Sequence, residues 1–200
     1  PVDTTNWPTL LGAVMTSDAQ AEAGTAEGQG PVEISPEVAR KLEDHREELF
    51  EKFEIRDEFP SAVMTEAEKR TEDIQTEIEE EVDERRDLRD MTTWTTDPVD
   101  AQDFDDALSV EEREDEYVLW VHIADVTHYV TPDTNMWEEA VERANTVYLP
   151  AYTMHMLPPM LAETVCSLVP EEDRLAHTVE MHLDKETLGY EEIDIYKSVI

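Results

Sequence analysis

Five aspartates stand within ten residues in the run Asp97-Pro98-Val99-Asp100-Ala101-Gln102-Asp103-Phe104-Asp105-Asp106. Like-charged carboxylates a few ångströms apart cannot all stay ionised without a counter-charge. The run leads directly into the apolar Ala107-Leu108, which places its end beside a buried strand. A divalent cation supplies the counter-charge that such a cluster needs. The competing interpretation is a solvated acidic loop that only improves solubility.

The residue types in this run, which we call the aspartate loop (residues 97–106), select a hard metal ion. Oxygen ligands without Cys or His favour Mg²⁺, or Mn²⁺, over Zn²⁺. An EF-hand is excluded because, counted from Asp97 or Asp103, the third and fifth positions are not both Asp or Asn and the sixth is not Gly. Mg²⁺ held by a few carboxylates keeps positions open for water and phosphate oxygens and activates a bound water. The predicted chemistry is phosphodiester hydrolysis.

The chain as a whole is strongly acidic, with 51 Asp and Glu against 15 Lys and Arg and a formal net charge of −36 at pH 7. A basic nucleic-acid-binding protein and a basic membrane-surface helix are excluded as whole-chain descriptions, because each needs a positive surface. No apolar run approaches the roughly 18 residues of a membrane span, and the N-terminus lacks the basic region of a secretory signal. The sequence therefore predicts a cytoplasmic protein without a membrane partner.

The acidic excess is spread along the chain rather than collected in a tail. A protein of this kind repels itself at low ionic strength and is screened within about 3 Å at 1 M salt. This distribution predicts a cytoplasm with molar salt, and an ordinary acidic interaction protein is the alternative. The single cysteine, Cys166, excludes an intrachain disulfide and is predicted to be a small buried side chain.

Patterning divides the chain into a predicted disordered tail at 1–34, a helical region at 35–90 and a region of short strands and helices at 91–200. Helical periodicity predicts one helix over about 36–54, a second long helix after Pro60, and helices at 135–145 and 158–167. Trp137, Ala140 and Val141 are the expected inward residues of the third of these. Period-two apolar runs predict strands at 92–96, 107–110 and 117–123, and a hairpin of 175–183 with 189–200.

The predicted fold class is mixed α/β, of the α+β kind: a helical N-terminal segment followed by a mainly antiparallel sheet flanked by helices. The last predicted strand stops at Ile200 without a closing signal. We therefore expect the sheet to be incomplete at the C-terminus.

Five sequence blocks, in their order, resemble the catalytic RNB domain of the ribonuclease II / ribonuclease R family. The blocks are RDLRD (86–90), TDPVDAQDFDDALS (96–109), VHIADVTHYV (121–130), VYLPAYTMHMLPP (147–159) and CSLVPEEDRLAHTVEM (166–181). The resemblance covers roughly residues 85–200 and implies the N-terminal part of an RNB-like domain. The family's phosphate-contacting arginine would lie beyond this sequence, so the resemblance does not predict that these 200 residues are active alone.

The resemblance implies a processive exoribonuclease that hydrolyses single-stranded RNA from its 3′ end to nucleoside 5′-monophosphates, with Mg²⁺ or alternatively Mn²⁺. By the family's motif, Asp97 and Asp106 ligate the metal, and Asp103 supports the cluster in both metal binding and catalysis. Asp105 is the residue whose loss removes cleavage but not binding. Tyr148 corresponds to the tyrosine that stacks on a base near the 3′ end, and the alternative for it is a core aromatic.

Arg86 and Arg89 belong to the main basic cluster of the sequence and are candidates for RNA phosphate contact, with pairing to nearby acids as the alternative. A short helical region stands where the family commonly carries cold-shock-type modules, which is similar to the short forms of salt-loving archaea. The second interpretation of the whole chain is a non-catalytic RNB-like RNA-binding or scaffold module. Loss of one of the four aspartates would mark it, and all four are present. No obligate protein partner is inferred.

Overall fold

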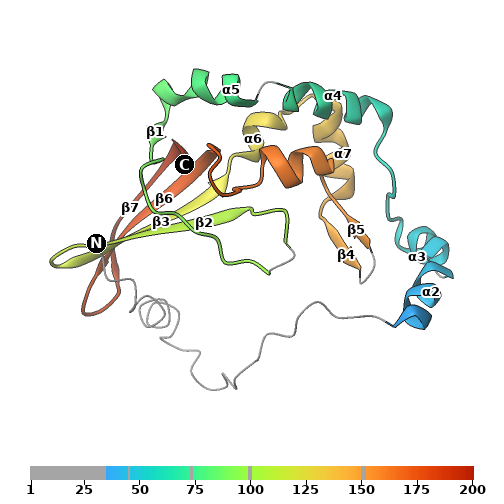
Figure 1. Ribbon diagram of the computed structural model, residues 1–200, viewed down its shortest axis with the longest axis horizontal. Helices are drawn as coiled ribbons and strands as arrows, with labels where there is room; N and C mark the ends of the chain where they lie inside the picture. Colours follow the sequence, from blue (N-terminus) through green and yellow to red (C-terminus); the bar gives the residue numbers. More distant parts are fainter. Residues whose placement is uncertain (1–34, 45, 73, 99–100, 150–151) are drawn as a thin grey trace.

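A computed structural model describes residues 35–200 apart from positions 45, 73, 99–100 and 150–151. The predicted tail at 1–34 lies outside the described residues. The segment predicted as a helix at 36–54 forms α2 (Pro36–Asp44) and α3 (Arg46–Phe53), and position 45 between them lies outside the described residues. Val38 and Phe53 remain exposed, and Figure 1 shows the two helices standing away from the sheet.

The second predicted helix is present as α4 (Ser61–Thr71) and α5 (Ile74–Glu81), followed by the short η2 (Val82–Glu84). Pro60 is the residue that precedes α4, where its missing N–H costs no helical hydrogen bond. The apolar side of these helices faces the core, because Val63, Ala67 and Ile78 are buried.

Five strands form one sheet in the order β1-β7-β6-β3-β2. They are β1 (Arg86–Asp87), β2 (Asp106–Glu112), β3 (Glu116–Ala124), β6 (Leu175–Asp184) and β7 (Tyr190–Val199). All neighbours are antiparallel except β1 and β7. The predicted strands at 107–110 and 117–123 and the predicted C-terminal hairpin are therefore confirmed.

One stretch of chain reaches both edges of this sheet. It starts as β1 beside β7, and Trp94 then forms an isolated bridge with Leu108 of β2. The sheet is consequently curled, with the stretch 86–94 running across it (Figure 1). The strand predicted at 92–96 is reduced to this single bridge, because only Trp94 exchanges backbone hydrogen bonds with β2, at 3.0 and 2.8 Å.

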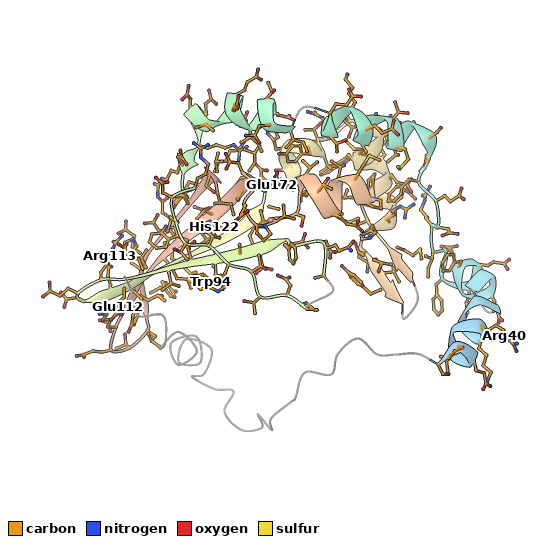
Figure 2. The ribbon with its side chains drawn as sticks, viewed as in Figure 1. Arg40, Trp94, Glu112, Arg113, His122 and Glu172 are labelled. Carbon is orange, nitrogen blue, oxygen red and sulfur yellow. The ribbon has the colours of Figure 1, made fainter. Side chains whose placement is uncertain are left out.

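Buried hydroxyl groups and one imidazole form a hydrogen-bonded chain through the curled sheet. Ser109 Oγ lies 2.8 Å from Thr93 Oγ1 and 3.0 Å from His122 Nε2. The other imidazole nitrogen of His122 lies 2.8 Å from Thr178 Oγ1, which is 2.6 Å from Ser198 Oγ. Burial lowers the pKa of His122 to about 4, so the imidazole is neutral at pH 7. Figure 2 shows His122 among the strands.

Helical segments cover one end of the sheet and enclose the main core (Figure 1). They include α4, α5, α6 (Val126–Tyr129), α7 (Asn135–Arg143) and the π-helix η3 (Leu161–Val165). Their buried residues form one cluster together with Leu175 and Val199 of the sheet. The π-helix replaces the longer helix predicted at 158–167. The mixed α+β fold class is confirmed.

The helix predicted at 135–145 is present as α7, but two of its inward residues were predicted wrongly. Trp137 is 39% exposed and Val141 is 61% exposed, whereas Met136 and Glu139 are buried. The reason is polar and long-range. The carboxylate of Glu66 in α4 accepts a hydrogen bond from the Met136 amide at 3.0 Å, and Glu139 forms ion pairs with arginines on both sides of it in sequence, Arg56 and Arg143.

A short hairpin that the sequence did not predict follows α7. It consists of β4 (Val147–Leu149) and β5 (Tyr152–Met154), which pair only with each other. Within the described residues, no helix is both long and apolar enough to cross a lipid bilayer.

Candidate active site

The aspartate loop ends at the edge of the sheet where β2 begins. Asp106 is the first residue of β2 and lies opposite Ile123 near the end of β3. The carbonyl oxygen of Asp105 accepts a hydrogen bond from the Ala124 amide at 3.0 Å, which ties the loop to β3. The sheet therefore fixes the last two carboxylates of the run through their backbone. Asp100 lies outside the described residues.

An apolar anchor and a buried hydroxyl hold the middle of the loop. The Phe104 ring packs against a small cluster of Ala107, Ala124 and Leu168. Its amide donates to Ser167 Oγ at 3.0 Å, and its carbonyl oxygen accepts from the Leu168 amide at 2.9 Å. Sequence reasoning assigned no role to Ser167, although it belongs to the same block as Cys166, which is buried as predicted. Its position within a quoted motif was the available signal.

The four aspartates named by the motif interact electrostatically. Partial burial raises the pKa of Asp105, and three neighbouring negative charges raise it further, those of Asp103, Asp106 and Asp97. One carboxylate oxygen of Asp97 is buried without a hydrogen-bond partner in the described structure. The cluster thus combines oxygen donors with unbalanced negative charge, which is the chemistry that a hard divalent cation satisfies.

In the part of the chain that the structure describes, no three acidic, histidine or cysteine side chains are gathered closely enough to form a ready-made metal site. The residues fit Mg²⁺ by donor type and by charge.

Tyr148 of β4 reaches the aspartate loop from a distant part of the chain. Its hydroxyl donates a hydrogen bond to Asp103 Oδ2 at 2.8 Å, and this bond, with partial burial, raises the pKa of Tyr148 to about 12. The residue is 66% exposed. The structure therefore places an accessible aromatic ring beside one carboxylate of the cluster, and a core position for Tyr148 is excluded.

Arg86 and Arg89 lie at β1 and are paired with carboxylates. The guanidinium of Arg86 contacts Glu180 at 3.2 Å and Asp194 at 2.5 Å, and it stacks 3.6 Å from the centroid of the Tyr196 ring. Arg89 pairs with two aspartates, Asp87 at 2.6 Å and Asp173 at 2.9 Å. These contacts favour pairing with nearby acidic residues, which was the alternative stated for Arg86 and Arg89. RNA phosphate contact by these two arginines stays a prediction.

A buried ion pair supports the end of β3 next to the loop. Arg85 Nη2 lies 2.9 Å from Asp125 Oδ2, and neither side chain has more than 1% of its surface exposed. Burial opposes the charge on Asp125, but hydrogen bonds from Thr127 and Arg85 outweigh it, so the pKa of Asp125 is lowered. Asp125 also caps α6 by accepting from the His128 amide. This pair joins the helical layer to the sheet.

Residues 85–200 match the RNB domain, and the chain therefore belongs to the RNB domain family. The predicted resemblance and its extent are confirmed. Ribonuclease R of Chlamydia muridarum is 44% identical over 135 residues, which cover 67% of this chain and 19% of that protein. The chain spans about a fifth of the length of these curated relatives, all named ribonuclease R.

Solved structures agree with this assignment. Mycoplasma genitalium RNase R in complex with ribose-methylated single-stranded RNA matches with a TM-score of 0.67 and 32% identity, over 74% of this chain and 22% of that one. The same enzyme in complex with double-stranded RNA matches with a TM-score of 0.70 and 30% identity, over 77% of this chain and 27% of that one. The curled sheet with its helical layer is therefore the fold of a part of RNase R.

Proposed function

We propose that this chain supplies the metal-binding part of the active site of a Mg²⁺-dependent exoribonuclease, which shortens RNA from the 3′ end and releases nucleoside 5′-monophosphates. The observation that carries the proposal is the aspartate loop itself, whose carboxylates raise the pKa of Asp105 at the start of β2. Relatives of this chain are named ribonuclease R, and one of them, from Mycoplasma genitalium, has been solved in complex with single-stranded and with double-stranded RNA. These support RNA as the ligand class.

Within this proposal, Asp97, Asp103 and Asp106 would hold the metal. Bound Mg²⁺, or Mn²⁺, would supply positive charge to polarise a phosphoryl oxygen. The pKa of Asp105 is raised by its partial burial and then by its negatively charged neighbours, so it binds a proton more readily than an isolated aspartate does. This property suits a carboxylate that orients the attacking water and accepts its proton.

Tyr148 would bind the 3′-terminal region of the RNA through its exposed ring. Stacking of a base on an aromatic side chain contributes about 1–3 kcal/mol and tolerates any base. Because the Tyr148 hydroxyl is bonded to Asp103, the ring is held at a fixed place relative to the cluster. Stacking would therefore place the terminal phosphodiester near the carboxylates.

A net charge of −36 opposes the binding of a polyanion. Molar salt screens this repulsion, so the proposed setting is a high-salt cytoplasm, with single-stranded RNA 3′ ends as the partner. The expected consequence is an RNA affinity that rises with KCl concentration at low salt, where the usual salt response of a nucleic-acid-binding protein is a fall. Fluorescence anisotropy with labelled RNA measures it.

The test uses the full-length protein that carries this sequence, on 5′-labelled single-stranded RNA in molar KCl with Mg²⁺. We expect stepwise shortening from the 3′ end, abolished by EDTA and by Asp105→Asn, with RNA binding retained. Asp115→Asn is the matched control, because Asp115 lies exposed in the turn between β2 and β3. A wild-type protein that binds RNA without shortening it, in all salt and Mn²⁺ conditions, would refute catalysis and favour a scaffold role.

A further inference from the structure

We propose that Ser167 is the positioning residue of the aspartate loop: its single buried hydroxyl fixes the backbone on both sides of Asp103 and thereby sets where the metal-binding carboxylates stand. This inference rests on the proposed function of the loop. It concerns a residue that makes no contact with the proposed reacting groups and acts through the backbone that carries them.

The Ser167 hydroxyl uses both of its hydrogen-bonding capacities on the loop. Its Oγ donates to the Gln102 carbonyl oxygen at 2.8 Å and accepts from the Phe104 amide at 3.0 Å. These two groups belong to the residues immediately before and after Asp103. The Phe104 carbonyl oxygen is held in turn by the Leu168 amide at 2.9 Å. The peptide units that flank Asp103 therefore cannot rotate without breaking a buried hydrogen bond.

Ser167 is itself rigidly held, and it has no exposed surface. It follows the π-helix Leu161–Val165, and its amide donates to the Thr164 carbonyl oxygen at 3.2 Å. The side chain of Arg174, only 6% exposed, donates from Nε to the carbonyl oxygens of Ser167 at 2.9 Å and Thr164 at 3.1 Å. Single π-helical turns are frequent at functional sites, and here the turn presents the hydroxyl that the loop needs.

The charge of the loop explains why a neutral anchor is needed. Asp103 is one of the negative charges that act on Asp105, and it also accepts the Tyr148 hydroxyl. Electrostatic repulsion drives these carboxylates apart, and a cationic side chain beside them would compete with a metal ion for the same oxygens. A hydroxyl that bonds to the backbone resists the repulsion without itself occupying a carboxylate oxygen. Serine is suited to this because its hydroxyl donates and accepts at once.

The test compares Ser167→Ala with Ser198→Ala in the full-length protein. Ser198 is a matched control, since it is equally buried and its hydroxyl bonds to Thr178 Oγ1 at 2.6 Å and to the Ala176 carbonyl oxygen at 3.3 Å, inside the sheet. The first readout is hydrogen exchange of the Phe104 amide in metal-free protein. We expect Ser167→Ala to accelerate it by about tenfold or more, because the bond to Oγ is lost. Ser198→Ala should leave it unchanged.

The second readout is the half-saturating Mg²⁺ concentration, measured for metal binding by calorimetry and for activity by RNA shortening. For Ser167→Ala we expect the half-saturating Mg²⁺ concentration to rise about tenfold, as for the loss of a supporting shell around metal ligands. RNA affinity in EDTA should stay at the wild-type value. Ser167→Cys keeps a weak donor and acceptor, so its half-saturating Mg²⁺ concentration should lie between those of the wild type and Ser167→Ala. This variant carries the test if Ser167→Ala does not fold.

Equal Phe104 exchange and equal Mg²⁺ midpoints in Ser167→Ala, Ser198→Ala and wild type would overturn the inference. The inference about Ser167 and the proposed exoribonuclease function can fail separately. If the wild-type protein fails to shorten RNA, the exoribonuclease proposal fails, whereas the exchange and calorimetric readouts still decide whether Ser167 positions the loop.

Discussion

Replacing His122 by Gln removes an ionisable group from the middle of the curled sheet and should change how stability depends on pH. The His122 side chain is fully buried, with one imidazole nitrogen bonded to Ser109 and the other to Thr178. This arrangement needs one nitrogen to donate and the other to accept in a neutral ring, and both hydroxyls can adapt to either tautomer. Protonation would put an unpaired charge in the interior.

The magnitude follows from the two pKa values of the imidazole. Burial lowers the pKa of His122 from 6.5 to about 4, so the unfolded chain binds this proton more readily than the folded protein does. Stability therefore rises with pH between about 4 and 6.5 and is level above that range. The gap between the two values corresponds to about 3 kcal/mol of stability lost on acidification from pH 7 to pH 4.

The assay is urea unfolding between pH 4 and pH 7, followed by tryptophan fluorescence in constant salt. Protonation of the many carboxylates affects wild type and variant alike, so the difference in free energy of unfolding isolates His122. We expect the wild type to lose about 3 kcal/mol more than His122→Gln towards pH 4. If the difference in free energy of unfolding between wild type and His122→Gln stays constant from pH 4 to pH 7, the reasoning is refuted.

Two further predictions concern the surroundings of the loop. Tyr148→Phe keeps the stacking ring and loses only the bond to Asp103, so RNA affinity in EDTA, measured by anisotropy, should change less than threefold, whereas Tyr148→Ala should lose about 1–3 kcal/mol of binding free energy. Equal losses of RNA binding free energy in Tyr148→Phe and Tyr148→Ala would show that the hydroxyl, and not the ring, contributes to binding. Arg85→Met leaves Asp125 buried without its ion pair and should lower the free energy of unfolding by about 3–5 kcal/mol. Adding Asp125→Asn, which removes the buried charge but keeps an oxygen for the His128 amide, should restore part of it in urea denaturation, and a double variant as unstable as the single one would contradict the ion-pair account.

The sequence by itself determined the parts of this protein that depend on local pattern. Alternating apolar residues identified β2, β3 and the β6–β7 hairpin, because a strand exposes its two faces with a period of two. The aspartates and the absence of Cys or His from the loop predict a hard divalent cation, and this stays a prediction. The five blocks in order identified the RNB family, and the match to residues 85–200 confirms it.

Elements whose form depends on distant partners were predicted less well. Helical periodicity located α7, but it could not choose between two faces of similar apolarity. Glu66 decides the matter by binding the first turn of α7 from 70 residues away, so that Trp137 faces solvent. The segment 92–96 has strand composition, yet pairing with the short edge of β2 gives it only one bridge, at Trp94.

Only the tertiary structure assembled the candidate site. Tyr148 reaches Asp103 across 45 residues, and Ser167 reaches the loop backbone across 63 and 65 residues. No local periodicity encodes such contacts, because they arise when separate elements pack on a common core and their loops close. The sequence therefore determined which residues can perform the chemistry. The folded sheet, the β4–β5 hairpin and the π-helix decided which of them meet.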